Sequence, residues 1–185
     1  MLTGALIFLV QTVCGLFVVT LLLRFYLQWA RAPHRNPISD FLHALTDFMV
    51  RPARRLIPGL WGLDLATLLL AWLLQFIELL IVLQIQGFAL QLPAALLLSL
   101  VLLVKTFLYI AMVAVFVQAL LSLLSPHSPA MPLLNAMTRP MLRVFQRRIP
   151  PIGNIDLSPL FALVIIQLLL MLPVAWLEVT VPRLF

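Results

Sequence analysis

The feature that most constrains this chain is a set of four apolar segments, each long enough to cross a membrane as a helix. A bilayer core about 30 Å thick needs about 20 helical residues. The spans are predicted at about residues 2–28, 65–85, 94–124 and 157–176. Hydrophobic residues make up 64% of the 185 positions and charged residues 10%, whereas soluble domains are about 25% charged. We therefore predict an all-α integral membrane protein, in which Pro173 kinks the last span or ends its regular part.

In each half of the chain, one amphipathic segment lies between the two spans. Asn36 and Pro37 are typical of an N-cap and a first helical residue. Apolar residues then recur at three- and four-residue steps, with charged residues between them. This predicts an amphipathic helix at about 37–50, too short and too charged to cross the membrane, that lies in the interface plane. A looser version covers about 130–148, and the prolines of both loops are expected to stop these helices.

The chain is predicted to consist of two related halves, residues 1–92 and 93–185. At a constant offset of 92, identical residues of several rare types coincide, which indicates a duplication. Each half has two spans, so the halves are expected to be parallel repeats related by an axis along the membrane normal. The matched pairs are Pro37 and Pro129, Thr46 and Thr138, Arg51 and Arg143, Arg55 and Arg147, Ile57 and Ile149, Pro58 and Pro150, Asp64 and Asp156, Leu65 and Leu157, and Gln75 and Gln167.

The distribution of arginines predicts the topology. Nine arginines lie in the first and third loops, whereas the turn around Gly87 has no charged residue. The positive-inside rule then places both arginine-rich loops in the cytoplasm and both termini outside. Basic residues outnumber acidic ones by 12 to 6. Because they flank apolar spans, lipid headgroups explain them better than nucleic acid does.

The repeated loop is the strongest candidate for a functional motif. Asp64 and Asp156 stand where the second and fourth spans begin, and each carboxylate can cap the helix that follows. The simpler interpretation is a cap, a turn and a topology signal. The functional alternative is a paired basic surface that binds anionic lipid headgroups or an acidic partner. The motif residues are Thr46, Arg51, Arg55, Pro58, Asp64, Thr138, Arg143, Arg147, Pro150 and Asp156.

Ionisable and amide side chains inside the spans form a second candidate site. A charge in the hydrocarbon costs about 2.5–3.5 kcal/mol, so Glu78 and Lys105 suggest a partner or a function. With Gln75 and Gln167 they could line an intramembrane polar path. The simpler interpretation places both charges near the outer boundary, where Glu78 pairs with Lys105 or snorkels. Arg24, near the inner end of the first span, is expected to snorkel.

Chemistry that depends on a metal, a cofactor or a nucleophile has no support in the sequence. His34, His43 and His127 lack ligand spacing and have no cysteine cluster beside them. No phosphate-binding glycine loop or nucleophile elbow is present. The sequence thus predicts no cofactor and no enzyme activity.

The loop pattern resembles the YggT family of bacterial membrane proteins, which has plastid relatives and often carries two such units. The resemblance rests on T-x-P, arginines, I-P and then D-x-S-P opening a membrane helix, and it covers roughly residues 6–172. The second half carries Thr138-Arg139-Pro140 and Asp156-Leu157-Ser158-Pro159; the first has Phe48 for the first Pro and Ala66-Thr67 for Ser-Pro. The resemblance implies a multi-spanning protein of the bacterial inner membrane without an established enzyme activity. It also implies a loose link to osmotic or ion homeostasis and to assembly of membrane complexes.

The leading functional hypothesis is a non-enzymatic membrane protein that organises or assists other membrane components through its basic loops. Its expected partners are anionic lipid headgroups and another membrane protein. The alternative is an ion transporter, a channel or a channel subunit. Four spans make a narrow bundle, so conduction would need a dimer or a larger ring, and an oligomer is expected.

Overall fold

The computed structural model describes residues 2–33, 36–57, 59, 63–88, 91–125, 127–147 and 156–184. The regular elements within these residues are helices, which confirms the all-α prediction. Their order is α1 Leu2–Trp29, α2 Pro37–Leu56, α3 Leu65–Gln86, α4 Leu92–Leu124, α5 Met131–Gln146, α6 Ser158–Leu169, the π-helical turn Leu170–Val174 and α7 Ala175–Leu184.

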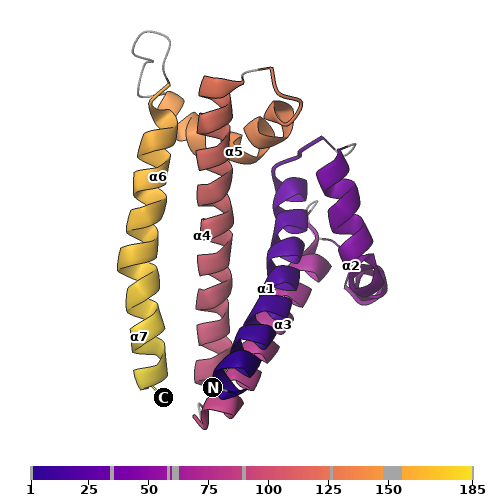
Figure 1. Ribbon diagram of the computed structural model, residues 1–185, viewed down its shortest axis with the longest axis vertical. Helices are drawn as coiled ribbons and strands as arrows, with labels where there is room; N and C mark the ends of the chain where they lie inside the picture. Colours follow the sequence, from indigo (N-terminus) through magenta and orange to yellow (C-terminus); the bar gives the residue numbers. More distant parts are fainter. Residues whose placement is uncertain are drawn as a thin grey trace.

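Four helical rods form the body of the molecule. They are α1, α3, α4 and the continuous rod Ser158–Leu184, and each is long and apolar enough to cross a membrane. The four predicted spans are therefore confirmed, and the chain is a multi-pass membrane protein. In Figure 1 both termini lie at one end of these rods, and α2 and α5 lie at the other end.

The rods pack as two pairs, one from each half of the chain. α1 runs along α3, and α4 runs along α6 and α7. The larger core surrounds Leu21 and Tyr26 and extends across the halves to Leu103 and Met137, whereas the second core gathers around Val115 and Ala162 within the second half. Tyr26 joins the two halves, because its hydroxyl donates a hydrogen bond to the carbonyl oxygen of Met137 at 2.8 Å.

The outer faces of the rods are covered with large apolar side chains. Phe8, Phe116, Met171 and many similar residues are exposed. In water such a surface would drive association, because monomeric soluble proteins rarely show large contiguous apolar patches. Lipid is the solvent that suits it, as the composition predicts.

The first amphipathic helix is longer than predicted, whereas the second, Met131–Gln146, lies within its predicted range of about 130–148. Asn36 caps α2 as expected, its side-chain oxygen accepting a hydrogen bond from the backbone N–H of Ser39 at 2.8 Å. Pro52, however, lies inside α2, so the predicted end near residue 50 is wrong; Pro140 lies inside α5, as the predicted range already placed it. A proline deletes one hydrogen bond of the helix, and packing against the spans maintains the helix beyond it.

The amphipathic face of α2 contacts both protein and the surroundings. Leu42 and Val50 are buried against the spans, whereas Phe41 and Phe48 are exposed. Phe48 also meets Phe17 of α1 edge to face, with ring centroids 6.2 Å apart. In Figure 1, α2 turns back beside the upper part of α1, and α5 crosses the upper ends of α4 and α6. Each helix therefore covers the end of its own pair of spans.

Pro173 does not end the last span. The helix widens into a π-helical turn at Leu170–Val174 and continues to Leu184, beyond the predicted end at Trp176. A π turn is one way in which a helix accommodates a proline without breaking. This continuation brings Glu178 alongside α4.

Candidate functional site

The aspartate before α3 fastens the end of α2 to the start of the second span. Asp64 is buried and accepts hydrogen bonds from Nε and Nη2 of Arg54, at 3.0 and 2.5 Å. It also accepts from the backbone N–H of Thr67 at 3.3 Å and from the Thr67 hydroxyl. Burial would raise the pKa of this carboxyl, but the hydrogen bonds and charge of Arg54, together with Thr67, outweigh burial and lower the pKa.

The second half repeats this contact with a neutral donor. Asp156 accepts a hydrogen bond from Nε2 of Gln146 at 2.8 Å and from the backbone N–H of Ser158 at 2.9 Å. Here too burial raises the pKa of the carboxyl, and the bonds from Ser158 and Gln146 lower it by more. Gln146 stands at the repeat offset from Arg54, so one geometry closes both loops. The sequence prediction missed this pair because it compared only identical residues.

The repeated threonines have a packing role. Thr46 and Thr138 are fully buried, and each hydroxyl donates to a backbone carbonyl one turn earlier, on Leu42 at 2.6 Å and on Leu134 at 2.9 Å. A threonine with its hydroxyl satisfied in this way can face a neighbouring helix without an unpaired polar group.

The repeated arginines point away from the bundle. All four are exposed, and they lie on or next to α2 and α5, at the end opposite the termini. Arg51 is paired with Asp47 of its own helix, with Nη2 and Oδ2 2.7 Å apart. The other three are Arg55, Arg143 and Arg147, and Arg139 is exposed beside them. Pro58 and Pro150 of the predicted motif lie outside the described residues.

Arg24 does not snorkel, contrary to prediction. It is 5% exposed, and its Nη1 donates to the hydroxyl of Thr46 at 2.7 Å and to Oδ1 of Asp47 at 2.8 Å. The reason is that α2 folds back over the end of α1 and brings Asp47 as a counter-charge. Burial raises the pKa of Asp47, but hydrogen bonds and charges from Arg24 and Arg51 lower it overall.

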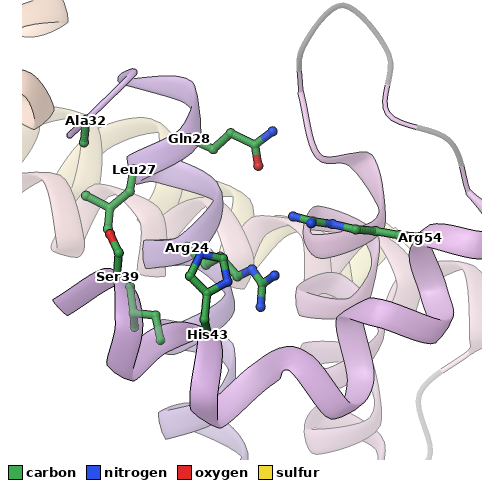
Figure 2. Close-up of a pocket in the computed structure, with 8 residues that line it drawn as sticks. Arg24, Leu27, Gln28, Ala32, Ser39, His43 and Arg54 are labelled. Carbon is green, nitrogen blue, oxygen red and sulfur yellow. The ribbon is translucent and has the colours of Figure 1, made fainter. Parts of the chain in front are cut away.

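A cavity of about 270 Å³ opens beside Arg24, between α1 and α2. Figure 2 shows that the guanidinium groups of Arg24 and Arg54 and the amide of Gln28 extend into the same space, with the imidazole of His43 next to Arg24. No sequence motif predicts this cavity, because its polar residues come from separate helices. Among the described residues, the lining is Arg24, Leu27, Gln28, Ala32, Ser39, Leu42, His43 and Arg54.

Three of the four residues of the predicted intramembrane path lie together. Gln75, Glu78 and Lys105 line one cavity of about 360 Å³ between α1, α3 and α4. Nε2 of Gln75 donates to Oε2 of Glu78 at 3.2 Å. Gln167 instead lines an apolar hollow of about 520 Å³ between α4 and α6.

The ion pair expected between Glu78 and Lys105 is replaced by another. The Lys105 ammonium donates to both carboxylate oxygens of Glu178, at 2.7 and 2.9 Å. The continuation of the last span past Pro173 makes this pair possible and ties α4 to α7. Within the described ranges, no cluster of three or more histidine, cysteine, aspartate or glutamate residues is arranged to hold a metal ion.

Comparison with known proteins agrees with this architecture. The family model described as CCB3/YggT matches residues 3–85 and again residues 97–177, so the tandem repeat is confirmed. An uncharacterised protein of Pseudomonas aeruginosa is 35% identical over 178 residues, covering 92% of this chain and 89% of the relative. The uncharacterised protein YggT of Escherichia coli K12 is 33% identical over 167 residues, covering 90% and 87%. No solved structure matches the chain.

Proposed function

We propose that this chain, which belongs to the CCB3/YggT family, acts without catalysis. The relatives named above are uncharacterised. Its role is to organise or assemble other membrane components through the basic end of its bundle. It resides in the bacterial inner membrane, with this basic end in the cytoplasm and both termini outside.

One observation carries the proposal: the same loop-closing contact is built twice. Arg54 with Asp64 and Gln146 with Asp156 hold the two amphipathic helices at one end of the spans. This arrangement holds the exposed arginines at one end of the bundle, which supports a contact with lipid headgroups. A duplicated scaffold that presents basic side chains toward the interface suits contact with anionic lipids or an acidic partner.

The exposed arginines supply enough attraction for such contacts. Each basic residue near an anionic leaflet contributes about 1 kcal/mol, and the attraction decays within a Debye length. Several arginines on one rigid face therefore act together and remain sensitive to salt. Anionic lipids gathered at this face would in turn favour membrane proteins that share them.

Lipid enrichment around the reconstituted protein tests the proposal. Arg55→Gln, Arg143→Gln and Arg147→Gln are combined, because within the described residues none of these arginines forms an ion pair. Energy transfer from the tryptophans to labelled phosphatidylglycerol should fall, and recovery of cross-linked membrane proteins from cells should fall with it. Arg183→Gln, at the opposite end, is the matched control. Unchanged enrichment and unchanged recovery in the triple variant would contradict the proposal.

A second candidate is ion transport, favoured by the polar cavity within the spans. Gln75, Glu78 and Lys105 meet there, together with Gln11 of α1. A carboxylate and an ammonium held inside apolar helices are costly unless they have a partner or a function. A narrow bundle of four spans would conduct only as a dimer or a larger ring.

Flux into proteoliposomes tests transport directly. Under potassium, sodium and proton gradients, the Glu78→Gln variant should lose flux relative to the wild type. Gln167→Ala is the control, because this intramembrane amide lies in a different hollow. Equal flux in wild type, variant and empty liposomes would remove this candidate.

A further inference from the structure

The cavity beside Arg24 has the character of a built anion site. Its polar lining comes from two helices, with Arg24 and Gln28 from α1 and His43 and Arg54 from α2. We propose that it binds a phosphate group, carried by a lipid headgroup or by a soluble ion, between the two guanidinium groups. This site goes beyond the proposed function, which rests on the exposed arginines.

The electrostatics of the cavity favour an anion. Asp47 is shared by Arg24, Arg51 and the His43 imidazole, and Asp64 serves Arg54. Three arginines thus share two carboxylates. Neither carboxylate is among the residues that line the cavity. Arg51 does not line the cavity, so the lining carries the guanidinium groups of Arg24 and Arg54, each held by a carboxylate that stands outside the lining.

Arg24 retains a donor that the protein does not satisfy. Its side chain is 95% buried, and within the described residues Nε has no hydrogen-bond partner. A buried N–H without an acceptor is unfavourable, and native structures rarely leave one. Nε itself has almost no accessible surface, so a phosphate in the cavity would bind at the guanidinium end of Arg24 that extends into it, where the planar fork of arginine matches the geometry of phosphate.

Size and position limit what the cavity can take. Its volume of about 270 Å³ falls just below the range of about 300–1,000 Å³ typical of ligand pockets, so it suits a headgroup-sized anion. Arg24 stands five residues before the end of α1, about 8 Å along the axis at about 1.5 Å per residue. The site therefore lies close to the end of the span, where lipid phosphates are expected.

The surroundings allow both sources of phosphate. Leu27 lines this cavity and also an apolar groove of about 610 Å³ between α1, α4 and α5. A lipid with its phosphate at Arg24 would have apolar surface next to it. On the other side, His43 and Arg54 have side chains that are 49% and 44% exposed. A soluble ion could enter past them.

The second half of the chain shows that this basic character does not follow from the fold alone. A corresponding hollow of about 440 Å³ lies at α4 and α5 and is lined by Asn135 and Gln146, which stand at the repeat offset from His43 and Arg54. The counterpart of Arg24 is Phe116. Arg139 is the charged residue that remains there. Among the described residues, Arg24, His43 and Arg54 line the cavity beneath α2, whereas the corresponding hollow has one basic residue.

The comparison between the halves also supplies the test variant. His43→Asn with Arg54→Gln places in the first cavity the residues that the second hollow already carries. The loop contact to Asp64 should persist, because Gln146 makes the same bond to Asp156. Arg183→Gln is the control, since it removes an exposed arginine from α7, outside both the cavity and the basic end of the bundle.

Calorimetric titration of the full chain in dodecyl maltoside micelles measures binding. The probes are inorganic phosphate, dihexanoyl phosphatidic acid and, as the zwitterionic reference, dihexanoyl phosphatidylcholine. Wild type and control should bind phosphatidic acid saturably, and the test variant at least about tenfold more weakly, since charge-assisted hydrogen bonds are lost. Binding of inorganic phosphate as well would identify the phosphate group alone as sufficient, whereas binding of phosphatidic acid alone would identify the lipid as the source.

Three results would overturn the proposal. They are no saturable binding of either anionic probe by the wild type, equal affinity in the test variant, and an equal loss in the test and control variants. The last would assign binding to general surface charge. The triple variant used for lipid enrichment retains Arg24 and Arg54 of the cavity, so loss of enrichment with intact phosphate binding would separate this site from the proposed function.

Discussion

Replacing the two loop aspartates separately should have unequal effects on stability. Asp64 is the N-cap of α3, and its side chain is only 4% exposed. Loss of an N-cap costs about 0.5–2 kcal/mol. Arg54, which is half-exposed, can be rehydrated, so the lost ion pair adds only about 0–1 kcal/mol. We expect Asp64→Ala to lower the free energy of unfolding by about 0.5–3 kcal/mol.

Asp156→Ala provides the matched comparison. Asp156 is exposed and stands one residue before the N-cap position of α6. It accepts one backbone and one side-chain hydrogen bond, and exposed bonds of this kind contribute at most about 0.5–1 kcal/mol. The assay is unfolding by sodium dodecyl sulfate in mixed micelles, followed by circular dichroism. A cost for Asp156→Ala equal to or above that for Asp64→Ala would refute the reasoning.

The pH dependence separates the cap from the charge. Asn caps helices about as well as Asp, so Asp64→Asn should retain the cap and lose only the attraction to Arg54. The folded-state pKa of Asp64 is lowered. The carboxylate's contribution is therefore complete above the unfolded value of about 3.9 and is lost as the pH falls through the folded pKa. Wild type and Asp64→Asn should differ at neutral pH and converge in strong acid; a constant difference would contradict the ion-pair account.

Three further predictions concern backbone strain, the contact between halves and topology. Arg31 follows α1 with φ of 51°, a conformation that costs an L residue about 1–2 kcal/mol, so Arg31→Gly should raise stability by about 1 kcal/mol in the detergent titration. Tyr26→Phe removes the hydrogen bond to Met137 and should cost about 1 kcal/mol without changing the helix content. Cysteines placed at Ala53 and Gln91, in a variant without the native cysteine, should be labelled from opposite sides of the membrane; labelling from one side would overturn the topology.

Hydropathy and capping chemistry predicted the main elements of the fold. The spans could be located because a run of about 20 consecutive apolar residues is long enough to cross the bilayer core as a helix. Asn36 at the start of α2 and Gly87, left-handed with φ of 74° at the end of α3, mark helix boundaries by local chemistry. Pro52 misled the prediction, because tertiary packing carries α2 past it. Pro173 does interrupt the regular helix, but a π-helical turn carries the span beyond its predicted end at Trp176.

The partners of charged residues could not be predicted, because they depend on how distant segments pack. Arg24 is buried by α2, which folds back over it, and no residue of the first span indicates that it will be covered. Lys105 pairs with Glu178, which is 73 residues away. Its nearer alternative, Glu78, turns instead to Gln75. Depth and pairing are thus tertiary properties that residue spacing does not fix.

Residues at the repeat offset can make the same contact even where their residue types differ. Arg54 and Gln146 differ in type and yet make the same contact to the aspartate ten residues later. Each amphipathic helix must be fastened to its spans, so both halves need a donor at this position. Neither half needs a positive charge there for that purpose, since Gln146 closes its loop without one. Closing the loop therefore does not account for the charge of Arg54, which lines the cavity beneath α2 together with Arg24, where the proposed phosphate site differs from its counterpart.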